Sequence, residues 1–199
     1  MSKKESTAKK AAIIGYITAA ILLFAVVLVI PQSRAVFKSL SGAHPYLMGF
    51  AKFALLATAG ELIAAYIANS APTVPVKIAA RFVIWGFIGV WITFMMKVFS
   101  VAAAQMMASG LLPGGDSSFL RALYTSVMMN TSFGPTFMAV HKCSDKWLEL
   151  RSKKADSSLK SVIGSIDWSA FVGFTLLKTV PLFWIPAHTV TFMLPSEYQ

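Results

Sequence analysis

Residues 78–108 read IAARFVIWGFIGVWITFMMKVFSVAAAQMMA, an apolar run with Arg81 and Lys97 as its ionisable side chains. A membrane helix needs about 20 predominantly apolar residues to cross a hydrocarbon core roughly 30 Å thick. This run is longer than one crossing requires, and Pro113-Gly114-Gly115 closes it after a tail of small residues. The stretch therefore predicts a transmembrane helix.

Outward from this run, the chain carries more segments of the same kind. Four have the length and composition of a membrane span: residues 11–30, 46–68, 119–140 and 166–194. The second of them ends in a helix-breaking segment, Asn69-Ser70-Ala71-Pro72. Prolines lie inside the last two, and neighbouring helices or water can satisfy the carbonyls that a proline frees. The sequence thus predicts an all-α integral membrane protein with five transmembrane helices.

The composition supports a membrane protein. The chain has 199 residues, of which 56% are hydrophobic and 13% are charged. A soluble domain carries roughly 45–50% apolar and about 25% charged residues, so a soluble globule is disfavoured. The single cysteine, Cys143, excludes an intramolecular disulfide and a zinc cluster of several thiolates. We expect the lipid bilayer to be the main partner.

The basic residues follow membrane topology rather than a nucleic-acid footprint, so we expect no nucleic-acid partner. Lys and Arg concentrate in cytoplasmic segments of membrane proteins. With the N-terminus in the cytoplasm, Arg34, Lys38 and Arg121 fall outside, while Lys52, Lys97 and Lys178 fall within spans. The other basic residues then face the cytoplasm: Lys3, Lys4, Lys9, Lys10, Lys77, Arg81, Lys142, Lys146, Arg151, Lys153, Lys154 and Lys160. This asymmetry predicts a cytoplasmic N-terminus and an external C-terminus.

The chain divides into an N-terminal segment and a membrane bundle. Residues 1–45 hold a basic cytoplasmic tail, an extra transmembrane helix and a connecting segment, and residues 46–199 hold a four-helix bundle. The apolar run of the first helix exceeds the usual 7–15 residues of a cleaved signal, which predicts an uncleaved signal anchor. This start favours a plasma membrane of bacterial type, with an organellar membrane as the alternative.

Polar side chains inside spans are rare and costly, so they are the candidate functional residues. By the helical rise, Glu61 lies about 12 Å, Asn130 about 15 Å and Lys178 about 15–18 Å from the inner surface. We therefore expect Glu61 and Lys178 to pair across the bundle near Asn130, facing a water-filled interior. The structural alternative is an ion pair that only holds the helices together.

Other polar and small residues have simpler expected roles. Lys52 and Lys97 lie nearer the outer face, where their ammonium groups can snorkel to the headgroups, and Arg81 is expected to anchor the inner interface. Small residues are expected to let helices approach closely. They are Gly60, Ala64, Ala68, Gly86 and Gly89.

Candidate catalytic residues are few. His141 and Asp145 are one helical turn apart, which is ligand spacing, but an interfacial role for them is favoured. His44 and His188 are placed at the outer surface and His141 at the inner one, so the three cannot share a metal. We find no phosphate loop, nucleophile elbow or zinc motif. The sequence predicts neither an enzyme nor a cofactor, and a membrane-embedded enzyme using His141 and Asp145 is the weakest alternative.

From His44 onward, a series of short motifs resembles a known family of small membrane proteins. These motifs are His44-Pro45, Gly60-Glu61-Leu62-Ile63-Ala64-Ala65, Arg81 with Gly86 and Gly89, Asn130 with Pro135, and Trp168, Ile185-Pro186, Phe192 and Pro195. The family is the peroxisomal membrane protein and mitochondrial inner-membrane pore family of the Mpv-seventeen type. The chain departs from its signature at Glu61, where the family has Asp, and at Ala65, where it has Gln.

The resemblance implies a compact bundle of four helices that forms a poorly selective channel, and it gives Arg81 some functional weight. The sequence therefore predicts a channel or transporter-like conduit for small solutes, lined by Glu61, Lys178, Asn130 and Arg81. Its expected partners are a small-molecule solute and further copies of the chain. The alternative function is a non-transporting scaffold that binds partner proteins or lipids.

Overall fold

A computed structural model describes residues 3–69 and 74–199. The fold is all-helical, at 85% helix, and no strand occurs in these two stretches. The chain forms two compact units, an N-terminal unit of Met1–Thr93 and a C-terminal unit of Phe94–Gln199. The boundary falls inside helix α4 (Ile78–Ala108), which contributes its first half to one unit and its second half to the other.

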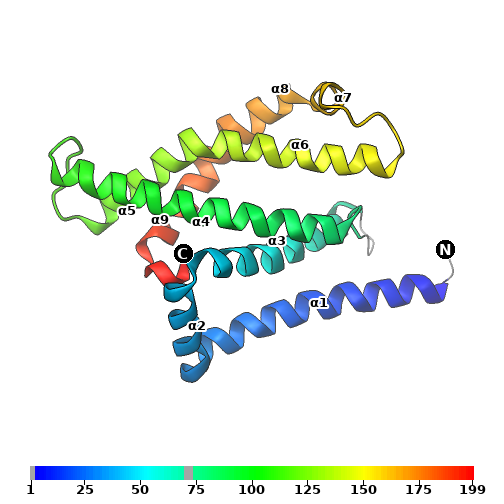
Figure 1. The fold of residues 1–199 in the computed structure, drawn as a ribbon, viewed down its shortest axis with the longest axis horizontal. Helices are drawn as coiled ribbons and strands as arrows, with labels where there is room; N and C mark the ends of the chain where they lie inside the picture. Colours follow the sequence, from blue (N-terminus) through cyan, green and yellow to red (C-terminus); the bar gives the residue numbers. More distant parts are fainter. Residues whose placement is uncertain (1–2, 70–73) are drawn as a thin grey trace. The chain divides into compact units, whose positions relative to one another are not determined.

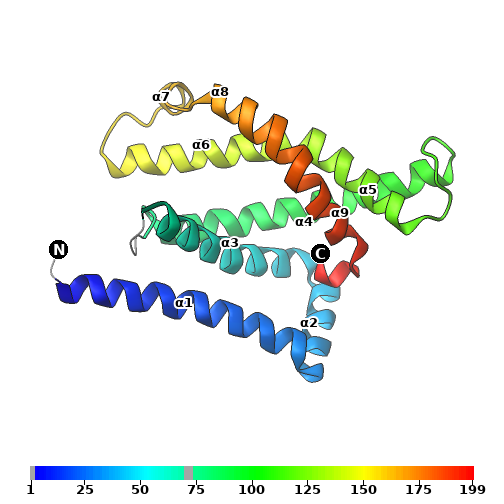
Figure 2. The ribbon, with the colours of Figure 1, turned by 180° about the vertical axis from the view of Figure 1, so that it is seen from behind.

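Three helices and the start of α4 build the N-terminal unit. They are α1 (Lys3–Val29), α2 (Pro31–Ala43) and α3 (Pro45–Asn69). Helix α1 ends where Ile30 adopts an extended conformation and Pro31 opens α2, since proline suits the first helical turn but lacks the amide that would continue α1. Helix α2 lies across the ends of α1 and α3, which run antiparallel (Figure 1 and Figure 2). The sequence predicted only a connecting segment where α2 stands.

Glycines bring α3 and the first half of α4 into close contact. A β-carbon on Gly89 would overlap the backbone oxygen of Gly49, and one on Gly86 would overlap the ring of Phe50. The expected packing role of Gly86 and Gly89 is confirmed. Gly60 makes no such contact within the N-terminal unit, since its added β-carbon would meet no atom within 4 Å, and its packing role stays a prediction.

The C-terminal unit begins with the second half of α4 and a glycine turn. Gly114 and Gly115 have φ angles of +121° and +54°, a conformation that favours glycine, and they allow the chain to reverse after Pro113. Helix α5 (Ser118–Met128) follows, capped by the Ser117 side chain, which accepts a hydrogen bond from the Leu120 amide. This turn agrees with the predicted end of the apolar run.

Two long helical runs of the C-terminal unit contain π-helical segments beside prolines. The first run joins α5, η1 (Met129–Phe133) and α6 (Gly134–Ser152). In η1 the Gly134 amide donates to Met129 five residues back, just before Pro135, which has no amide hydrogen to donate.

The second run joins α8 (Trp168–Ala170), η2 (Phe171–Trp184) and α9 (Ile185–Met193), with Pro181 inside η2. Helix α5 packs along α9 (Figure 2). Two short helices complete the unit, α7 (Leu159–Gly164) and the 3-10 helix η3 (Ser196–Tyr198).

Four helices are long and apolar enough to cross a membrane: Lys10–Val29, Pro45–Asn69, Ile78–Ala108 and Trp168–Met193. Between 11% and 28% of the residues in an 18-residue apolar window of each helix are buried inside the protein, so most of this apolar surface is exposed, as in a helix that faces lipid. They agree with four of the five predicted spans. The fifth, residues 119–140, is helical but is not among the four, and its crossing stays a prediction. Of the predicted breaker, only Asn69 lies within the described residues.

Candidate functional site

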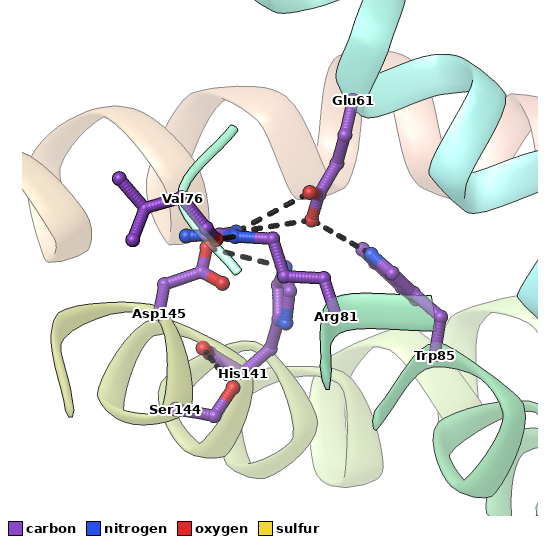
Figure 3. A network of polar contacts seen from close by, with 7 residues as sticks. All are labelled: Glu61, Val76, Arg81, Trp85, His141, Ser144 and Asp145. Carbon is purple, nitrogen blue, oxygen red and sulfur yellow. Dashed lines mark hydrogen bonds and ion pairs between the residues drawn. The ribbon is translucent and has the colours of Figure 1, made fainter. Parts of the chain in front are cut away.

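The first candidate site is a polar cluster in the N-terminal unit, between α3 and the start of α4. Arg81 donates from Nη1 to both carboxylate oxygens of Glu61, at 3.2 and 3.3 Å. The indole Nε1 of Trp85 donates to Oε1 of the same carboxylate at 2.8 Å. Figure 3 shows Glu61 reaching from α3 toward both side chains. One carboxylate thus accepts hydrogen bonds from a charged and a neutral donor.

Helical spacing explains why these donors meet one acceptor. Arg81 and Trp85 are four residues apart on α4, so they lie on the same face. A second hydrogen bond orients the guanidinium, since its Nε donates to the Val76 backbone oxygen at 2.9 Å. The side chains of Arg81 and Glu61 are 13% and 15% exposed, so the ion pair is shielded from the surroundings. Such a pair strongly penalises the loss of one partner.

The cluster adds contacts that the sequence did not predict for its members. Glu61 lies about 12 Å, and Arg81 about 5 Å, from the nearest end of its own helix at the standard rise. The sequence predicts an interfacial anchor for Arg81 and a pair of Glu61 with Lys178, and the structure adds that Glu61 contacts Arg81 and Trp85. Lys178 belongs to the C-terminal unit, and its pairing with Glu61 stays a prediction.

The second candidate site lies in the C-terminal unit, where η1 meets α9. Asn130 is 2% exposed, and its Nδ2 donates to the Ser126 backbone oxygen at 2.9 Å. Nδ1 of His188 lies 3.0 Å from Nδ2 and 3.1 Å from Oδ1 of Asn130. The imidazole nitrogen therefore donates to the amide oxygen or accepts from the amide nitrogen, according to its tautomer.

Ser126 links this pair to the backbone of α9. Its hydroxyl is fully buried and donates to the Ile185 oxygen at 2.8 Å, while the Thr189 hydroxyl donates to the same oxygen at 2.7 Å. The ring of Trp184 lies 5.3 Å from the ring of His188, one helical turn away. The result is a network that joins α5, η1 and α9 through buried polar groups.

Sequence reasoning found Asn130 but missed His188. Counting along the chain predicted only that His188 lies near the outer surface, and the structure adds that its ring contacts Asn130. A sequence signal existed, since Ser126 and Asn130 are four residues apart and share a polar face of an apolar helix. That face required a polar partner on another helix.

The remaining predicted residues lie apart from these clusters within their own units. The Lys52 ammonium lies 5.9 Å from the centre of the Phe37 ring, and the Lys97 and Lys178 side chains are exposed. His141 Nε2 lies 3.6 Å from an Asp145 carboxylate oxygen on α6, so the predicted one-turn spacing does bring them into contact. Together they offer two ligand atoms, and a protein zinc site uses three or four.

Comparison with known proteins leaves the family prediction untested. No family model matches the sequence, and no curated protein or solved structure is similar enough to it to count as a match. The resemblance to the pore family therefore stays a prediction, and it rests on the motifs of the chain itself.

Proposed function

We propose that the protein is a multi-pass membrane conduit for small solutes, in which the two polar clusters contribute to the path. The observation that carries the proposal is the Glu61–Arg81 ion pair, which lies between two apolar helices long enough to cross a membrane. Ionisable groups at membrane depth are costly and commonly mark solute or ion pathways. The proposal includes no catalytic activity and no cofactor.

Interrupted helices support the same proposal. The contact of the buried Asn130 with the half-buried His188 lies beside π-helical segments and close to Pro135 and Pro186. Transporters place their binding sites at broken helices because irregular backbone exposes polar groups that can replace a solute's hydration. π-helical turns are also frequent at functional sites.

The finer architecture belongs to the same proposal. We infer that residues 119–140 form a fifth span and that residues 46–199 make a four-helix bundle of the Mpv-seventeen type, preceded by a signal-anchor helix. The basic residues favour a cytoplasmic N-terminus and a plasma membrane of bacterial type. The lining would be Glu61, Arg81, Asn130 and Lys178, and copies of the chain would associate if one bundle were too small for a pore.

A non-transporting scaffold is the second candidate, and one observation favours it. The Glu61 carboxylate is engaged by donors of its own chain, as expected for an ion pair that holds two helices together. In that function the exposed apolar helix faces would bind partner proteins or lipids. Stable co-purification with a partner, without solute flux, is its expected result.

The test is solute release and single-channel recording from liposomes that contain the purified protein. Glu61→Gln, Asn130→Ala and Lys178→Met are compared with wild type and with Thr131→Val. Thr131 is exposed, and its hydroxyl bonds to the backbone of its own helix, so it is a control that leaves both clusters intact.

We expect wild type to conduct and Glu61→Gln or Asn130→Ala to change conductance or selectivity, with Thr131→Val behaving as wild type. Each variant is first checked for correct folding by its melting temperature in detergent. Folded wild-type protein that leaves the bilayer silent would reject the conduit. Unchanged flux with a lower melting temperature in Glu61→Gln would leave that pair a purely structural role.

A further inference from the structure

The N-terminal unit contains an apolar pocket that the proposed conduit does not use. Its volume is about 530 Å³, within the range of about 300–1,000 Å³ that is typical of ligand sites. Helices α1, α2 and α3 line it, with Phe24, Phe37 and Leu55 among its apolar side chains. Leu23 and Leu40, at 49% and 44% exposed, border the pocket, so its wall continues into the protein surface.

The course of the chain creates this pocket. Helix α1 ends before Pro31, and α2 then crosses to the start of α3 instead of continuing along α1 (Figure 1). Because α2 takes up the turn between α1 and α3, side chains of all three helices face a shared space. One face of α2 is apolar, with Val36, Phe37 and Leu40 at the pocket, as in a helix that lies at a membrane surface.

One lining residue, Lys52, is charged. It lies about 10 Å along α3 from Pro45 at the standard rise. Its ammonium is 5.9 Å from the ring centre of Phe37 on α2, so the charge points toward the end of the pocket that α2 closes. The aromatic face stabilises the cation there. Gln32 and Ser33 of α2 add polar atoms to the same lining.

The surroundings of the pocket are basic. Residues 31–60 contain Arg34, Lys38 and Lys52 and no Asp or Glu. Arg34 and Lys38 are exposed and lie one turn apart on α2, but they do not line the pocket, so the positive charge inside it is that of Lys52. The pocket therefore combines an apolar chamber with a positively charged end, and its complement is a molecule with an apolar chain and a negatively charged head.

We propose that this pocket binds one anionic phospholipid. An acyl chain lies against α1 and α3, and the phosphate is held at the Lys52 end beside α2. Basic pockets between membrane helices bind anionic headgroups in this way. A second copy of the chain is a poorer occupant, because the Glu61 carboxylate in its apolar helix α3 is already bound by Arg81 and Trp85. Bulk lipid that merely coats the helices would bind without stoichiometry or headgroup selectivity.

The test is native mass spectrometry of the full-length protein in detergent, with phosphatidylglycerol and phosphatidylcholine of identical acyl chains as probes. The variants are Lys52→Met, Lys52→Arg and, to fill the chamber, Ala51→Phe. Lys97→Met is the matched control, since it removes an exposed lysine from another span that does not line the pocket. Inorganic phosphate and a free fatty acid with the same chain are tested as competitors.

We expect one phosphatidylglycerol to bind per chain, with affinity at least tenfold above that of phosphatidylcholine. Lys52→Met should remove this preference, and Lys52→Arg should keep it. Ala51→Phe should weaken the binding of both lipids, while Lys97→Met should bind both as wild type does. Neither phosphate nor the fatty acid should compete at the concentration of the phospholipid.

Equal binding of the two phospholipids would overturn the proposal, as would retention of the preference in folded Lys52→Met. Displacement by inorganic phosphate alone would identify a simple anion site. If the protein forms dimers and Ala51→Phe dissociates them, the occupant of the pocket is a second copy of the chain. If Lys52→Met does not fold, the comparison between Ala51→Phe and Lys97→Met still decides whether the chamber holds the lipid.

Discussion

The guanidinium of Arg81 contacts both carboxylate oxygens of Glu61, at 3.2 and 3.3 Å, and so joins α3 to α4 across 20 positions of sequence. Trp85 donates to the same carboxylate, so the loss of Arg81 and the loss of the charge on Glu61 have different consequences. Loss of Arg81 leaves a shielded negative charge with a neutral donor. Loss of the charge on Glu61 leaves a guanidinium that still donates to the Val76 oxygen.

Arg81→Met should therefore destabilise the protein more than Glu61→Gln does. Breaking a buried ion pair by removing one partner costs about 3–5 kcal/mol, and we expect the lower end of this range for Arg81→Met because both side chains are slightly exposed. Glutamine at 61 keeps an acceptor for Trp85 and should cost less. Unfolding by a graded denaturant in mixed micelles measures the loss in free energy of unfolding for each single variant. The double variant then gives the interaction energy between the two side chains. Equal losses in the two single variants would contradict this order.

Asn130→Ala should destabilise the C-terminal unit through the groups it leaves behind. The substitution removes the partner of His188 and the donor to the Ser126 oxygen at a site that is 2% exposed. Leaving a buried polar group unsatisfied costs about 1–3 kcal/mol. Asn130→Ala and His188→Phe should be less than additive when combined. Thr131→Val is the control, and a melting temperature for Asn130→Ala as high as for this control would refute the prediction.

The apolar helices could be predicted closely because length and hydropathy determine them. The predicted run 78–108 coincides with α4, and the predicted run 46–68 differs from α3 (Pro45–Asn69) by one residue at each end. Helix α2 was missed because its sequence, PQSRAVFKSLSGA, is too polar for a span and follows a proline. Its helicity shows in the one-sided placement of Val36, Phe37 and Leu40, a pattern that a search for membrane spans ignores.

The partners of polar residues could not be predicted from depth alone. Counting along a helix gives the height of Glu61 in the membrane, but successive residues turn by about 100°, so height does not determine which neighbour a side chain faces. The prediction paired Glu61 with Lys178 because the two have similar predicted depths in the membrane. It did not consider Arg81, which lies on the adjacent helix. The partner of His188 was not predicted for a related reason, since counting along the chain gives its depth but not its contact with Asn130.

Gly89→Ala should destabilise the N-terminal unit, while Gly60→Ala should not. A β-carbon at 89 would overlap the Gly49 oxygen and the Phe53 side chain, and overpacking typically costs about 1–3 kcal/mol. At 60 the added methyl meets open space, and alanine is favoured over glycine by about 1 kcal/mol in a helix interior. Melting temperatures in one detergent compare the two directly. A lower melting temperature for Gly60→Ala would instead reveal a contact on the exposed face of α3.

The titration of Glu149 should differ from that of an ordinary glutamate. It lies on α6, beyond the predicted span, where hydrogen bonds from Lys146 at 2.7 Å and Lys153 at 2.6 Å lower the pKa of its carboxyl from 4.5 to about 2. Because the folded pKa lies below the unfolded one, the pair stabilises the helix above about pH 4.5. That contribution is lost as the pH falls from about 4.5 toward about 2.

The expected contribution to global stability is small, because the Glu149 side chain is 38% exposed and solvent screens the ion pairs. The sharper measurement is therefore the carboxyl titration itself, followed by ¹³C NMR in micelles. We expect a midpoint well below 4.5 in wild type and in Lys142→Ala. In the double variant Lys146→Ala, Lys153→Ala the midpoint should return toward 4.5, and 1 M salt should shift wild type in the same direction. A wild-type midpoint near 4.5 would mean that the two lysines contact solvent instead of the carboxylate.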